Sequence, residues 1–146
     1  MITENIHVAI VEDDPEIRQT LALIIDGTAG FWCKLTFENG KEALKPLQEN
    51  YVDVVLMDIE MPKMNGIDVV KKLRADKIND HIRIVMVTSN KTLDFVTEAI
   101  DNAGANGFIT KPFTPVEMRK KLDPIIDEVM KIKRSKVGFM GKLFGR

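Results

Sequence analysis

The chain has 146 residues, of which 45% are hydrophobic and 29% charged, a balance typical of one folded globular domain and not of a disordered chain. Its net charge of −1 is unevenly distributed, because residues 131–146 carry six Lys or Arg and no acid. Without those six, residues 1–130 hold 15 basic and 22 acidic residues, a net charge of −7. An acidic body does not match a phosphate backbone, so we do not expect nucleic acid as a partner.

Two further features of the sequence bear on where the protein is located in the cell. Cys33 is the only cysteine, which excludes an internal disulfide. The sequence shows no secretory signal pattern and no apolar run long enough to cross a bilayer. We therefore expect a cytoplasmic protein with a folded body at residues 1–130 and a basic tail at residues 131–146.

Five short apolar runs, rich in β-branched residues, are typical of buried strands. They cover residues 7–11, 31–37, 52–58, 82–88 and 108–110. Each run is followed by a segment with apolar residues at helical spacing, so the chain is predicted to contain five strand–helix pairs.

The predicted helices have recognisable starts. Asp14 is placed to cap a helix whose first residue is Pro15, and residues 39–42 and 114–117 resemble capping boxes. Gly66 is expected in a loop, and Gly107 is expected to close the fourth helix. Pro124 lies inside the apolar pattern of the last helix and predicts a kink or a break there.

Strict alternation of strands and helices predicts the fold class. Strands that are apolar on both faces need helices on both sides, which indicates an α/β protein with a doubly wound, five-stranded parallel sheet. In such sheets ligands bind at the carboxyl ends of the strands, near the point where the strand order reverses.

Polar residues interrupt the apolar pattern at that edge. Glu12 and Asp13 end the first strand, Asp58 ends the third, Thr88 ends the fourth and Lys111 follows the fifth. Clustered carboxylates repel one another unless a hard cation such as Mg²⁺ lies between them. A carboxylate can also attack phosphorus to form an acyl phosphate, and a metal and a Lys would neutralise the phosphoryl charge. The group predicts a magnesium-dependent phosphoryl site.

Four motifs carry a resemblance to a known family. They are residues 11–15 (VEDDP), 57–66 (MDIEMPKMNG), 87–89 (VTS) and 107–113 (GFITKPF). Together they resemble the receiver domain of two-component response regulators over about residues 5–130, and the single-domain chemotaxis regulators are the nearest architectural analogue. The resemblance implies a flavodoxin-like receiver fold with strand order 2-1-3-4-5.

The resemblance also implies roles for the site residues. Asp58 would be the phosphoacceptor and, with Asp13, a direct Mg²⁺ ligand. Glu12 would act through metal-bound water, and Glu60 would offer its backbone carbonyl to the metal. Thr88 and Lys111 would contact the phosphoryl group.

Further family features concern switching and phosphoryl lifetime. Thr88 would couple to Phe108 so that the face formed by the fourth helix, fifth strand and fifth helix changes on phosphorylation; alternatively, Phe108 would be a plain core aromatic. The bond before Pro112 would be cis. Ser89 would crowd access to the phosphoryl group, and the side chains of Glu60 and Asn90 would tune its lifetime.

These features lead to one principal interpretation and two alternatives. A sensor histidine kinase or a phosphotransfer protein would phosphorylate Asp58, and output would be protein–protein contact because no DNA-binding domain follows. The first alternative is a phosphohydrolase that uses Asp58 and Glu60 as an acidic pair. The second is a scaffold that never switches, or an adaptor held at a membrane by the tail.

The tail has its own pattern. Basic residues at 131–136 precede Phe139, Met140, Leu143 and Phe144, which share one side of a helical projection. Such a basic amphipathic segment suits an anionic membrane surface, and residues 137–146 weakly resemble the membrane-targeting helix of some bacterial division-site ATPases. Three glycines argue against a stable free helix. The tail would therefore bind a membrane or partner, dock on its own domain, or remain a disordered solubilising segment.

Overall fold

The computed structural model of the chain describes residues 5–89 and 93–143, apart from the side chains at 93, 95 and 137–143. It contains a five-stranded sheet in the order β2-β1-β3-β4-β5, with every neighbouring pair parallel. The strands are β1 (Ile6–Val11), β2 (Phe31–Phe37), β3 (Val54–Asp58), β4 (Arg83–Thr88) and β5 (Gly107–Thr110). The predicted fold class and strand order are confirmed, and the strand ends differ from the predicted ones by two residues or fewer.

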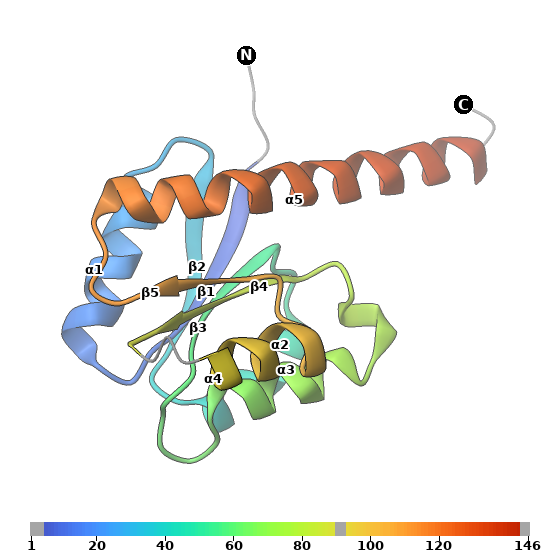
Figure 1. Cartoon of the computed structure of the whole chain (residues 1–146). Helices are drawn as coiled ribbons and strands as arrows, with labels where there is room; N and C mark the ends of the chain where they lie inside the picture. The colour runs from blue at the N-terminus through green and yellow to red at the C-terminus, as the bar shows by residue number, and fades with distance from the viewer. Residues whose placement is uncertain (1–4, 90–92, 144–146) are drawn as a thin grey trace.

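Helices cover both faces of the sheet (Figure 1). They are α1 (Pro15–Asp26), α2 (Gly40–Glu49), α3 (Gly66–Arg74), α4 (Leu93–Thr97) and α5 (Pro115–Leu143). A 3₁₀ turn (η1, Lys77–Asn79) precedes β4, and a π-helical turn (η2, Glu98–Asn102) continues α4. Gly66 is therefore the first residue of α3 and not a loop residue, and Gly107 begins β5 instead of closing the fourth helix.

The core consists of two layers separated by the sheet. Alternate strand residues point to opposite faces, so Ile10 packs toward α1 and α5 while Val11 packs toward α2, α3 and α4. On the α5 side, the helix contributes Met118, Leu122, Ile125 and Val129, all of them buried. Because both faces are dry, the polar ends of the strands become the places where a site can form.

The predicted helix starts are present in the structure. The Asp14 carboxylate accepts hydrogen bonds from the backbone N–H groups of Glu16 and Ile17, at 2.9 and 3.3 Å. Thr114 and Glu117 form a reciprocal capping box, with both side chain to backbone bonds at 3.1 Å. These caps hold the loops that follow β1 and β5 in fixed positions.

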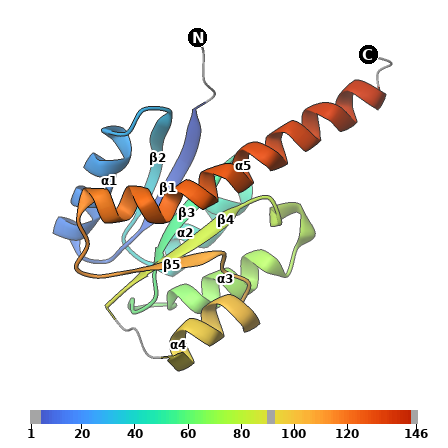
Figure 2. The same cartoon turned by 45° about the horizontal axis from the view of Figure 1, so that its top comes forward.

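The predicted break at Pro124 is wrong. The helix α5 is continuous from Pro115 to Leu143, past the predicted boundary between body and tail at residue 130 (Figures 1 and 2). Pro124 lies on the exposed side of the helix, while Leu122 and Ile125 beside it are buried against the sheet. That packing holds the helix together although one backbone hydrogen bond is missing. Gly138 and Gly141 of the tail occur in a continuation of an existing helix, which needs no new nucleus.

The first turns of the tail contact the amino-terminal edge of the sheet. Lys133 Nζ lies 3.3 Å from Asp53 Oδ2, and it lies 5.5 Å from the centre of the Tyr51 ring. Asp53 is buried, and it also accepts hydrogen bonds from the Tyr51 hydroxyl and the His7 backbone N–H, at 2.5 and 2.9 Å. We call this set, Lys133 with Asp53 and Tyr51, the tail latch.

The tail latch should contribute to stability. We expect Lys133→Ala to lower the free energy of unfolding by roughly 2 kcal/mol, because Asp53 would stay buried without its cation. Arg134→Ala, which removes the exposed neighbouring cation, should change it by less than about 0.5 kcal/mol. Urea denaturation of the two variants measures the difference, and equal effects would show that the latch contributes nothing.

Candidate functional site

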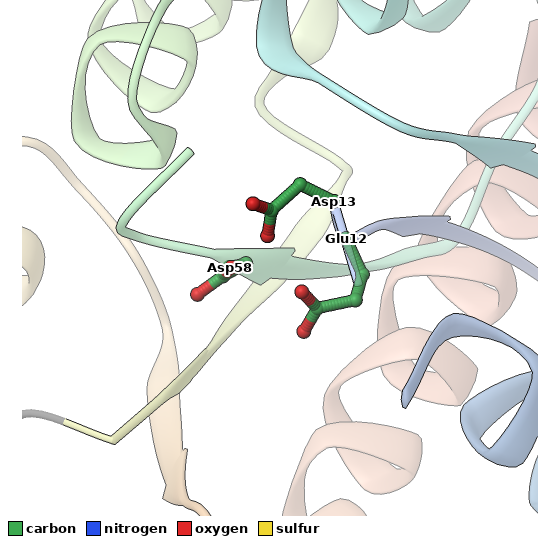
Figure 3. A group of neighbouring side chains, drawn as sticks. All are labelled: Glu12, Asp13 and Asp58. Carbon is green, nitrogen blue, oxygen red and sulfur yellow. The ribbon is translucent and has the colours of Figure 1, made fainter. Parts of the chain in front are cut away.

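The carboxyl ends of β1 and β3 bring three carboxylates together. Asp58 is the last residue of β3, and Glu12 and Asp13 follow directly after β1, which pairs with β3. One oxygen from each of Glu12, Asp13 and Asp58 lies within 4.8 Å of the others, and Figure 3 shows the three groups gathered at these strand ends. Asp58 and Glu12 are only 4% and 1% exposed, whereas Asp13 is exposed. The cluster is therefore open to solvent on the Asp13 side.

Lys111 supplies the positive charge of the site. Its Nζ lies 2.7 Å from Glu12 Oε1 and 3.5 Å from Asp58 Oδ1. The Lys111 backbone N–H donates to the carbonyl of Thr88 at 2.8 Å, which ties the loop after β5 to the end of β4. The Lys111–Pro112 peptide bond is cis. The Lys111 side chain thus extends from the end of β5 along the sheet edge to the carboxylates at the ends of β1 and β3.

The charges of this cluster shift one another. Burial and the neighbouring charge of Glu12 raise the pKa of Asp58 from 3.8 to about 8, although Lys111 opposes the shift. Burial by itself would lower the pKa of Lys111, but its hydrogen bond to Glu12 and the charges of Asp58 and Glu12 raise it. One cation thus does not fully neutralise the three acids, and a second positive charge would stabilise the ionised form of Asp58.

The donor set fits a hard divalent cation. Carboxylate oxygens are the ligands that Mg²⁺ prefers, and the cation needs water as well, which the exposed side of Asp13 admits. Glu12 is less available, because Oε1 pairs with Lys111 and Oε2 accepts the Asp14 backbone N–H at 3.1 Å. Asp13 and Asp58 are therefore the carboxylates best placed to bind a metal directly, and Glu12 is placed to bind one through water.

The remaining predicted residues lie at or near the same edge. Thr88 is buried at the end of β4, beside Asp58 in the sheet register, where Asp58 pairs with Val87. Ser89 is exposed and lines a cavity of about 420 Å³ together with Lys111 and Pro112. Glu60 is exposed, and Asn90 lies outside the described residues.

Phe108 lies farther from the carboxylates, in β5. The ring is partly buried against the core layer beneath α2, α3 and α4. Lys121 Nζ lies 5.2 Å from the ring centre, within the range of a cation–π contact. Phe108 thus combines a core contact with a position at the surface between β5 and α5.

Two glycines near Asp58 have a role that the sequence analysis did not assign. A Cβ on Gly66 would lie 2.0 Å from the carbonyl oxygen of Asp58, and one on Gly40 would lie 2.5 Å from that of Met64. Lys63 and Met64, in the loop between β3 and α3, have positive φ angles of 63° and 136°. Gly66 lies in the MDIEMPKMNG motif, but the need for a bare Cα there becomes visible only when β3 and α3 are in contact.

Comparison with known proteins agrees with this geometry. The family profile of the response regulator receiver domain matches residues 8–123. The chain therefore belongs to the response regulator receiver domain family.

The relatives include chemotaxis proteins that match this chain over almost their whole length. Chemotaxis protein CheY-3 of Vibrio cholerae is 33% identical over 129 residues, which cover 88% of this chain and 98% of that protein. CheY of Thermotoga maritima is 38% identical over 119 residues, covering 82% and 96%. The CheX–CheY–BeF₃–Mg²⁺ complex from Borrelia burgdorferi superposes with a TM-score of 0.77 at 26% identity, covering 84% of this chain and 90% of that one.

The raised pKa of Asp58 predicts how stability depends on pH. Between about pH 4 and pH 8 the folded chain keeps a proton on Asp58 that the unfolded chain has lost, so stability falls as pH rises through this window. Without divalent cations, Asp58→Asn should be more stable than the parent by about 2 kcal/mol at pH 8, and the difference should disappear toward pH 4. Thermal melts across pH in EDTA test this, and a variant that is less stable at pH 8 contradicts it.

Proposed function

We propose that the protein is a phosphorylation-activated signalling switch in which Asp58 is the phosphoacceptor. The observation that carries the proposal is the buried Asp58 carboxylate, in contact with Lys111 and within 4.8 Å of two further acids. A phosphohistidine on a sensor histidine kinase or phosphotransfer protein would be the donor. In the transfer, a bond forms between Asp58 Oδ and phosphorus, the histidine N–P bond breaks, and the histidine nitrogen takes up a proton.

Each residue around Asp58 would have its own role in phosphoryl transfer. Asp58 must be ionised to attack phosphorus, and Lys111 favours the ionised form. A bound Mg²⁺ would add positive charge that neutralises the phosphoryl oxygens. Asp13 and Asp58 would hold the ion directly, Glu12 through water, and Glu60 through its backbone carbonyl. Thr88, one strand away, would donate a hydrogen bond to a phosphoryl oxygen.

Output would be altered protein–protein contact through α4, β5 and α5. Thr88 and Phe108 lie on the adjacent strands β4 and β5, so a shift of the Thr88 hydroxyl toward a phosphoryl group would free space for the ring. Lys121, which covers the ring, would then move with it. We propose a switch and not an enzyme with turnover, because the site would store a phosphoryl group on its own Asp58 side chain.

Phosphorylation of Asp58 can be measured directly. Incubation with acetyl phosphate and Mg²⁺ should add one phosphoryl group by intact-mass spectrometry, and EDTA should prevent it. Asp58→Asn should abolish uptake, whereas Asp68→Asn, which changes an exposed acid in the first turn of α3, should not. Equal uptake by Asp58→Asn would overturn the assignment, and sustained release of phosphate with turnover would favour a phosphohydrolase. Uptake with unchanged NMR spectra in α4 and α5 would favour a scaffold that does not switch.

We further propose that the tail brings the protein to an anionic membrane surface. What supports this is the excess of six basic residues without an acid at 131–146, and the uninterrupted extension of α5 away from the domain in both views (Figures 1 and 2). Among the described residues, no helix is both long enough and apolar enough to cross a bilayer. The apolar side chains predicted to face lipid, Phe139, Met140, Leu143 and Phe144, lie outside the described part of the chain.

The tail proposal makes a separate prediction. Removal of residues 137–146, which keeps the tail latch, should abolish co-sedimentation with vesicles that contain phosphatidylglycerol. Arg134→Gln with the apolar segment intact should weaken binding by about fivefold, the contribution of one basic residue near an anionic surface. Unchanged sedimentation of the truncated chain would show that the tail is not the anchor.

A further inference from the structure

The part of α5 around Lys133 adjoins a row of aromatic rings at the amino-terminal edge of the sheet. The Trp32 and His7 rings are in edge contact with their centres 5.1 Å apart, His7 and Tyr51 follow at 5.6 Å, and Tyr51 stacks on His81 at 5.6 Å. The residues come from β1, β2 and the segments that precede β3 and β4, so parallel pairing places them at one edge. Lys133 lies over the Tyr51 ring and joins this row to α5.

Large apolar side chains in this row and beside it are exposed to solvent. Trp32 is 47% and Tyr51 42% exposed, and Ile78, whose carbonyl contacts His81 Nδ1 at 3.0 Å, is 74% exposed. Rings with one apolar and one polar part are typical of surfaces that meet the boundary between water and lipid. The edge therefore presents apolar area that the folded domain itself does not cover.

The exposed cations near the row are concentrated on α5. Lys131, Arg134 and Lys136 are exposed on the adjoining helix, and the Lys34 ammonium donates to the Tyr51 carbonyl at 3.0 Å. Of the acids close to the row, Asp53 and Glu128 are paired with Lys133 and Arg83, whereas Asp76 and Asp80, which flank Ile78, are exposed. Unpaired cations beside exposed aromatic rings complement an anionic lipid surface better than they complement a second copy of this basic tail.

We propose that the amino-terminal edge of the sheet, through Trp32, Tyr51 and Ile78, docks on the same anionic bilayer that the tail binds. The inference rests on the proposed membrane role of the tail and adds a second contact from the folded domain. The tail latch fixes the helix to this edge, so the two contacts act as one surface. Asp58 lies five residues along the strand from Asp53, about 17 Å away. The phosphorylation site would therefore face the cytosol, accessible to its donor, while the domain is docked.

Trp32 allows a direct test because it is the only tryptophan of the chain. With the full chain, vesicles of phosphatidylglycerol and phosphatidylcholine should shift Trp32 emission to shorter wavelength, and brominated lipid should quench it. Vesicles of phosphatidylcholine alone should do neither. Ile78→Ser should weaken binding about fivefold. Val116→Ser, which changes an exposed apolar residue in the first turn of α5 at the opposite edge, should leave binding unchanged.

The outcomes distinguish docking of the sheet edge from membrane binding by the tail alone. Co-sedimentation of the chain without any change in Trp32 emission would overturn docking of the edge and leave the tail as the sole anchor. Absence of both would overturn both. A shift of Trp32 emission that grows with protein concentration in the absence of vesicles would identify a second copy of the chain as the occupant, and would also overturn the inference.

Discussion

The buried Asp58 carboxylate, held beside Glu12 and opposed by Lys111, is the constraint on which the functional edge depends. Two acids that are almost fully buried and share one ammonium at 2.7 and 3.5 Å form a cluster that is short of positive charge. Burial and the neighbouring charge of Glu12 raise the pKa of Asp58, and the single ammonium of Lys111 does not offset them. A cation or a phosphoryl transfer partner changes this balance, so the site is sensitive to the events that a signalling domain must register.

The residues of this site are brought together by a sheet whose strands are short and parallel. Asp58, Thr88 and Lys111 come from three adjacent strands, and the backbone bond from Lys111 to Thr88 joins the last two of them. In the proposed switch, a change in the position of Thr88 would therefore alter the contacts of β5, where Phe108 lies between the core and the Lys121 ammonium. One scaffold can host many functions, so we expect partner choice to depend on surface residues such as these.

An aspartate lies at each end of β3, and the two aspartates have different surroundings. Asp58 at the carboxyl end belongs to an acidic cluster that is open to solvent on the Asp13 side, whereas Asp53 before the amino end is paired with Lys133, Tyr51 and the His7 backbone. The occupied end fixes a helix that continues well beyond the segment matched by the receiver profile. The extended α5 and the amino-terminal edge of the sheet thus form a surface separate from the Asp58 site, within one folded domain.

The sequence by itself determined the alternation of strands and helices, the strand-end acids and the caps at Asp14 and Thr114, because these depend on local periodicity and turn chemistry. The resemblance of four motifs was enough to expect the family and the strand order. Only the tertiary structure decided the charge balance at Asp58, the need for a bare Cα at Gly66 and the continuity of α5 through Pro124. Each of these depends on what packs against a residue from a distant part of the chain, and neither burial nor contact of that kind has a local signature. The tail latch belongs to the same class, since Lys133 and Asp53 are 80 residues apart in sequence and become partners only when α5 crosses the edge of the sheet.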